Sequence, residues 1–291
     1  MKYVPRHTNY TTVRPLRREP IYVKQTRDLV RLTGSVPSAV AEKFRQANLH
    51  VSVEGDISSL SISGASVLLV GDHRMGLEFA PLLAVLGEHE RDDAHWLAKP
   101  FSHNARIMHS LESTSQMVVP VLPGTLARDR PNIFNSDLGW RLLEWHRLPG
   151  HENLNRLNLA SIEHAARLLD DGHIVTLYPT GRIADAGSAP WRRGVGRILK
   201  QVIESKRDTT NVVLFRFDDF SSLRVARSLL LHSHGLRTRP YTITLRTESI
   251  GTVGELLREA NASNDIDTAQ ITAQLRQHYL AAFRGTAFRE L

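Results

Sequence analysis

Short apolar runs alternate with longer amphipathic stretches along most of the chain, a pattern typical of α/β proteins. Runs with the length and composition of β-strands occur at 50–55, 67–70, 96–98, 117–122, 173–178, 212–217 and 241–246. Helical patterns cover 28–48 in two pieces, 78–86, 104–112, 161–170, 197–205 and 268–283. This order predicts a central, mostly parallel or mixed sheet flanked by helices.

The first 49 residues differ from the rest of the chain. Residues 1–27 hold three prolines and little periodicity, which predicts an extended arm, and Ser38 is a candidate cap for a helix over 39–47. We therefore expect residues 1–49 to form a basic arm and helices packing on a main domain of residues 50–291. Within residues 1–31 only Glu19 and Asp28 oppose a set of basic residues: Lys2, Arg6, Arg14, Arg17, Arg18, Lys24, Arg27 and Arg31. Two interpretations stay open, contact with an anionic membrane or a solvated arm.

Composition limits the classes of partner and of chemistry. The net charge is +7, which favours an acidic partner: nucleic acid, an anionic membrane or a phosphorylated substrate. The arginines are dispersed and lack the aromatic interleaving of RNA-binding proteins, so we expect no nucleic acid. The chain has no Cys, which excludes disulfides and a cysteine nucleophile, and no apolar run long enough to cross a membrane. The amino-terminal residues lack the apolar region of a signal peptide, so a cytoplasmic protein, peripheral on the inner face of a membrane at most, is expected.

The strongest candidate for catalysis lies directly after the apolar run 67–70. Gly71-Asp72-His73 ends that run, and an apolar helical stretch begins after Glu78. Open α/β sheets place their sites at such strand ends. His73 and Glu78 can meet if His73 lies in the turn and Glu78 in the first turn of the helix, so that the carboxylate orients the imidazole as a base. About one His with an acid five residues on is expected by chance, so the position, and not the spacing, supports this dyad.

The other candidate motifs are weaker. His232 and His234 have the spacing of metal ligands, but they lack a nearby acid, and a pair in a loop is the favoured interpretation; we expect no metal site. The sequence contains neither a Walker-type phosphate loop nor a Gly-x-Ser-x-Gly motif.

Three separated blocks in residues 50–220 resemble the glycerol-phosphate and lysophosphatidic-acid acyltransferases, whose first block is a His followed after four residues by Asp. Here it is His73-Arg-Met-Gly-Leu-Glu78, with Glu in place of Asp. The second block is similar to Gly124-Thr-Leu-Ala-Arg-Asp129-Arg130. The third, Phe-Pro-Glu-Gly-Thr-Arg in the family, appears as Tyr178-Pro-Thr-Gly-Arg182, with Thr180 in place of Glu, and Arg192-Arg193-Gly194 is similar to the basic segment after it.

The resemblance implies an acyltransferase-like α/β fold and an O-acyltransferase of phospholipid biosynthesis. His73 and Glu78 would be catalytic, and the substrate would be held by Arg130, Thr180, Gly181, Arg182, Arg192 and Arg193. An acyl thioester of CoA or acyl-carrier protein would be the co-substrate, with no other cofactor, and the acceptor would be a glycerol-phosphate or a lysolipid. Arginine is suited to phosphate, although these arginines also fit a solvated rim. The alternative is a catalytically impaired relative that binds lipid or a protein partner, which the replacement of the family Glu by Thr180 favours.

Overall fold

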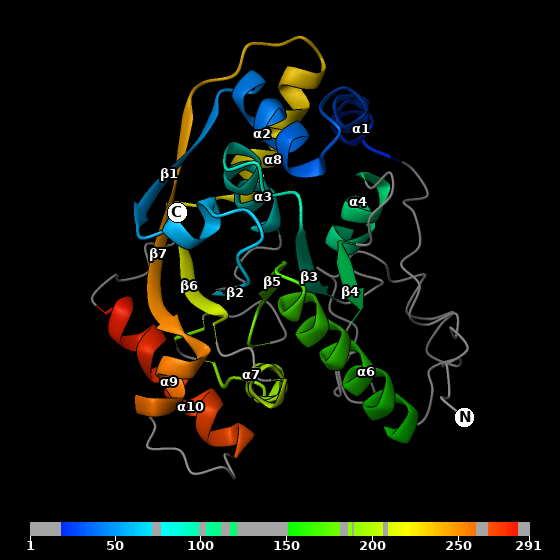
Figure 1. Ribbon diagram of the computed structural model, residues 1–291. Coiled ribbons are helices and arrows are strands. Elements are labelled where there is room, and N and C mark those ends of the chain that lie inside the picture. Colours follow the sequence, from blue (N-terminus) through cyan, green and yellow to red (C-terminus); the bar gives the residue numbers. More distant parts are fainter. Residues whose placement is uncertain are drawn as a thin grey trace.

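A computed structural model describes most of the chain, and the central feature of this structure is a seven-stranded mixed sheet (Figure 1). The described residues are 19–71, 77–98, 103–111, 117–120, 151–180, 186–187, 189–205, 209–259 and 267–284. The strands lie in the order β1-β7-β6-β2-β5-β3-β4. Their bounds are β1 Leu49–Gly55, β2 Val67–Gly71, β3 Ala94–Ala98, β4 Val118–Pro120, β5 Ile174–Leu177, β6 Asn211–Asp218 and β7 Tyr241–Thr252. The expected α/β class is confirmed.

Two strand directions divide the sheet. Strands β6, β2, β5, β3 and β4 are mutually parallel, whereas β7 runs antiparallel to β6 and pairs in parallel with β1. The central strand β2 is buried at all five positions, as its uninterrupted apolar sequence predicts. The carboxyl ends of the five parallel strands therefore meet at one edge of the sheet.

Helices cover both faces of the sheet, and each face has its own apolar core. We call the side covered by α1, α2, α3, α4 and α8 the first face, and the side covered by α6, α7, α9 and α10 the second face; Figure 1 shows them above and below the sheet. The first-face helices are α1 Ile21–Thr33, α2 Val36–Gln46, α3 Phe79–Glu88, α4 His103–Leu111 and α8 Ser222–Ser233. The second-face helices are α6 His151–Asp170, α7 Gly194–Glu204, α9 Val253–Glu259 and α10 Thr268–Ala282. A short 3₁₀ turn, η1, spans Ser58–Ser61.

The amino-terminal elements differ from their predicted form. Helix α1 begins at Ile21, so an extended arm up to residue 27 is wrong for its last seven residues. The cap of α2 is Ser35 and not Ser38: the Ser35 side chain accepts a hydrogen bond from the Ser38 backbone N–H. Pro37 then lies in the first turn, where its missing N–H costs nothing because that donor has no partner within the helix.

Two further helices fall where no helix was predicted, α8 and α9. His232 and His234 therefore lie in the last turn and at the carboxyl cap of α8, so their interpretation as a loop pair is wrong. None of the helices described is both long enough and apolar enough to cross a membrane.

Candidate active site

The adjacent ends of β2 and β5 are the part of the sheet edge where the candidate residues gather. The two strands are parallel, with Val70 opposite Leu177. The chain leaves β2 for α3 on the first face and leaves β5 for α7 on the second. Neighbouring parallel strands whose connections diverge in this way form a topological switch point, the place where open α/β sheets bind their ligands.

Glu78 lies at this edge, at the N-cap position of α3, with only 2% of its surface exposed. A carboxylate at a helix N-terminus is stabilised by the unpaired N–H groups and the helix dipole. The sequence predicted Glu78 in the first turn of this helix, and the structure places it directly before that turn. His73, the predicted partner, lies outside the described residues, so the dyad itself stays a prediction.

Tyr178, the residue that follows β5, lies next to Glu78. Burial of the phenol raises its pKa well above the usual value of 10, and the negative charge of Glu78 raises it further, while the Trp96 side chain opposes these effects. The hydroxyl is therefore neutral at physiological pH and can donate a hydrogen bond close to a buried carboxylate. Tyr178 belongs to the third block of the sequence resemblance, but no role was predicted for it. The sequence feature that could have drawn attention to Tyr178 is the alternation of side chains along the strand, which places Thr176 and Tyr178 on the same face of β5.

Gly71 provides the space in which aromatic rings from two strands approach each other. Strand β2 lies between β5 and β6, yet the rings of Tyr178 and Phe215 meet edge to face at 6.1 Å between centroids. A Cβ atom on Gly71 would lie 2.5 Å from the Phe215 ring. Only glycine leaves room for the Phe215 ring at the end of β2.

The third block and the following basic segment are joined by a backbone hydrogen bond. The Arg192 N–H donates to the Pro179 carbonyl at 2.7 Å, which brings Arg192 to the end of β5. Arg192 and Arg193 are exposed, and α7 begins immediately afterwards, where the N–H groups of a first turn have no partner within the helix. Thr180, in contrast, is 2% exposed. This edge thus combines a buried carboxylate with exposed guanidinium groups and a helix N-terminus, which suits an anionic group.

Four of the eight predicted site residues lie outside the described part of the chain: His73, Arg130, Gly181 and Arg182. The other four, Glu78, Thr180, Arg192 and Arg193, all lie close to the start of α3 or the end of β5. Their roles stay predictions, but the first and third blocks, about 100 residues apart in the sequence, belong to neighbouring strands.

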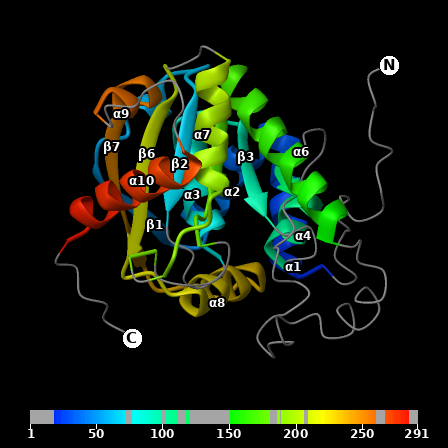
Figure 2. The same cartoon turned by 90° about the horizontal axis from the view of Figure 1, so that it is seen from below.

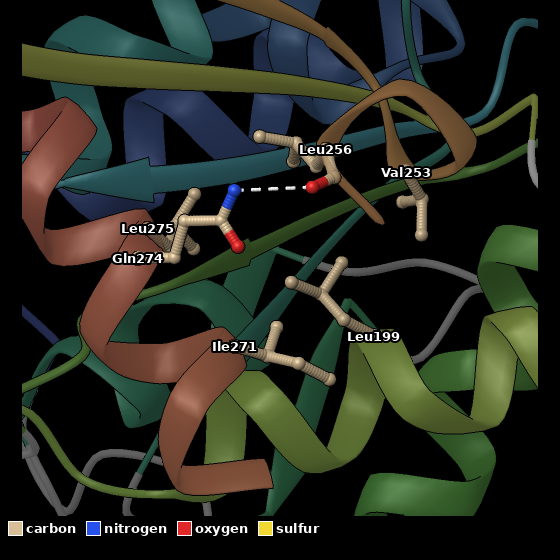
Figure 3. Close-up of a pocket in the computed structure, with 6 residues that line it drawn as sticks. All are labelled: Leu199, Val253, Leu256, Ile271, Gln274 and Leu275. Atoms are coloured by element: carbon tan, nitrogen blue, oxygen red, sulfur yellow. Dashed lines mark hydrogen bonds between the residues drawn. The ribbon is translucent and has the colours of Figure 1, made fainter. Parts of the chain in front are cut away.

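A small apolar cavity lies away from this edge, between α7, α9 and α10 on the second face (Figure 3). Its volume is about 10 Å³, room for about one water molecule. Gln274 closes one side, where its side-chain amide donates to the Leu256 carbonyl at 3.1 Å. A cavity of this size does not admit an acyl chain, so it is a packing defect and not a substrate pocket.

In the part of the chain that the structure describes, no three His, Asp or Glu side chains are arranged to hold a metal ion. In comparisons with known proteins, no family model matches the chain and no curated protein is significantly similar to it. The acyltransferase resemblance accordingly depends on the motifs and on their position at the sheet edge.

Proposed function

We propose that the protein is an O-acyltransferase that moves an acyl group from a thioester of CoA or acyl-carrier protein to a hydroxyl of a phosphorylated or lysolipid-like acceptor. The single observation that supports this most is the buried Glu78 carboxylate at the start of α3, beside Tyr178, where β2 and β5 diverge. A carboxylate so placed is suited to orient a base contributed by residues 72–76, which connect β2 to α3 and include His73.

In the proposed reaction His73 removes the proton from the acceptor hydroxyl as its oxygen attacks the thioester carbonyl. The new C–O bond forms a tetrahedral intermediate, which collapses with cleavage of the C–S bond, and the imidazolium returns the proton to the leaving thiolate. Glu78 holds the other ring nitrogen and stabilises the imidazolium. Its burial strengthens this interaction, because a nearby charge is screened less away from water.

The environment of Glu78 fits this positioning role. The Tyr178 hydroxyl is a neutral donor close to the carboxylate, which is only 2% exposed and so is shielded from water. The exposed guanidinium groups of Arg192 and Arg193, beside the first turn of α7, would bind an acceptor or donor phosphate. The acceptor would then approach from the solvent side of the edge.

The test measures thiol release from palmitoyl-CoA with and without a panel of glycerol-phosphate and lysophospholipid acceptors. Acceptor-dependent release should fall about 100-fold or more in His73→Ala, because general-base catalysis contributes at least this factor. Glu78→Gln keeps the shape of the buried side chain and removes its charge, so kcat should fall with little change in KM. Tyr178→Phe keeps the ring contact with Phe215 and should retain more activity than Glu78→Gln.

Matched variants separate phosphate binding from catalysis. Arg192→Gln with Arg193→Gln should raise the KM for a phosphorylated acceptor and leave kcat nearly unchanged. The reason is that the arginines would bind the phosphate equally well in the ground state and in the transition state. Arg45→Gln, an exposed arginine on α2, is the control and should change neither value. Unchanged activity in His73→Ala would refute the mechanism. If no thiol is released with any acceptor, the proposed enzymatic activity is refuted, and the alternative is a catalytically impaired relative that binds lipid or a protein partner.

A further inference from the structure

The outer surface of α8 combines exposed leucines with basic side chains in one stripe. Leu223, Arg227, Leu230 and His234 follow one another at intervals of four, three and four residues, so they lie on one side of the helix. All four are exposed, and Leu223 and Leu230 are 78% and 45% exposed. Val225 and Leu229 on the opposite side are buried in the first-face core. The helix therefore presents a second apolar surface outward, and it lies at the periphery of the molecule (Figure 2).

The loop after α8 extends this surface and is held in place. Gly235 ends the helix with a positive φ of 73°, and the Leu236 N–H donates back to the Leu231 carbonyl at 3.0 Å, which closes a Schellman turn. Leu236 is 54% exposed, and Arg237 and Arg239 beside it are exposed too. The Thr238 hydroxyl donates to the Ala47 carbonyl at 2.8 Å and fixes the loop to the end of α2.

Basic residues predominate on this surface. Residues 220–247 contain no Asp or Glu, and the arginines at 224, 227, 237 and 239 are all exposed. Arg224 is held over the Tyr241 ring, 5.5 Å from its centroid. Asp218, the last residue of β6, already pairs with Arg216 and Arg246. Asp219, which precedes α8, is an exposed acid at one end of the surface.

We propose that this surface, formed by Leu223, Arg227, Leu230, Leu236, Arg237 and Arg239, docks on an anionic phospholipid bilayer. The leucines would enter the acyl boundary while the arginines reach the phosphate groups, since their long side chains extend past apolar neighbours. A protein partner fits less well, because the apolar anchors of this surface are leucines, which are under-represented among the residues that dominate binding at protein interfaces. The proposal does not depend on catalysis.

The experiment is vesicle flotation of the full-length protein at low salt. Binding to vesicles of phosphatidylcholine mixed with phosphatidylglycerol is expected, with little binding to phosphatidylcholine alone and a decline as salt rises. Leu223→Ser with Leu230→Ser should weaken binding by about tenfold or more, because each leucine loses its apolar burial. Arg227→Gln with Arg237→Gln should weaken it by about fivefold for each arginine.

The chain offers a matched control on the second face. Leu159 of α6 and Leu280 of α10 are 42% and 37% exposed, and Leu159→Ser with Leu280→Ser should leave binding unchanged. His73→Ala should also bind normally, which separates this proposal from the proposed activity. Full binding by the α8 double variant, or equal loss in the control, would overturn the proposal. A shift of the α8 variant from dimer to monomer in gel filtration, without vesicle binding by the wild type, would assign the surface to a second copy of the chain.

Discussion

Gly71→Ala tests whether the packing at the end of β2 depends on the missing side chain. The new methyl group would lie 2.5–2.6 Å from three atoms of the Phe215 ring, whereas carbon atoms prefer separations of about 3.5–4.0 Å. The ring must therefore move by about 1 Å or β2 must shift. Phe215 is fully buried between the rings of Tyr178 and Phe217, at 6.1 and 5.9 Å, so it has little room to retreat.

Overpacking of this kind costs about 1–3 kcal/mol of the free energy of unfolding. For a chain of this length that corresponds to a fall in Tm of about 2–4 °C for each kcal/mol. Phe215→Leu alone should cost about 1 kcal/mol through lost contacts. The two changes together should cost less than their sum by about 0.5–3 kcal/mol, because a smaller residue at 215 removes the clash.

The assay is urea unfolding followed by circular dichroism for the two single variants and the double variant. Gly194→Ala is the matched control: nothing lies within 4 Å of the position that its new methyl group would take, and it opens α7, where alanine is the better helix former. It should be neutral or slightly stabilising. A Gly71→Ala protein as stable as the wild type, or a double variant whose cost is the plain sum, would refute the packing argument.

Three further variants test contacts away from the site, each by its free energy of unfolding. Asp93→Ala should cost about 3 kcal/mol, since the Arg91 guanidinium is buried and would lose its bidentate partner; a cost below about 1 kcal/mol would contradict this. Gly87→Ala should destabilise the packing of α2 on α3 by a similar amount, since its Cβ would lie 2.2 Å from the Pro37 carbonyl oxygen. A Gly87→Ala protein as stable as the wild type would contradict this close packing. Burial lowers the pKa of Lys43 in the folded protein. Between this lowered pKa and the pKa of about 10.4 in the unfolded chain, the unfolded chain binds more protons than the folded protein. The free energy of unfolding of the wild type should therefore rise with pH across that range. Lys43→Met should lack this rise, so its stability relative to the wild type should fall from pH 7 to pH 10; a constant difference would contradict the shift.

The buried strands were predictable from the sequence because their pattern has one cause. The Val67–Val70 run is apolar throughout because both of its faces meet helices, and its length and its terminal glycine gave β2 almost to the residue. Glu78 was placed at the start of α3 for a similar reason, since an uninterrupted apolar helix follows it.

The errors also have physical causes. Helix α8 was missed because Leu223 and Leu230 lie on its exposed side, which removes the polar stripe that marks an amphipathic helix. Ser35 was missed as a cap because Pro37 suggested a boundary, although proline is tolerated in a first turn. The contact of Tyr178 with Phe215 across Gly71 depends on the order of three strands, which no local pattern contains.

The pairing of β1 with β7 has a consequence for synthesis on the ribosome. The two segments are joined just before their first residues by Asn48 and Thr238, which are 190 residues apart in the chain. At about 5–20 residues per second, β1 emerges roughly 10–40 s before its partner exists. During that interval its hydrogen-bonding edge is open to other chains, and polar residues on β1, such as Ser52 and Glu54, then limit association. Folding of the nascent chain should therefore finish only after β7 is translated, and the unfinished chain is the state most in need of a chaperone.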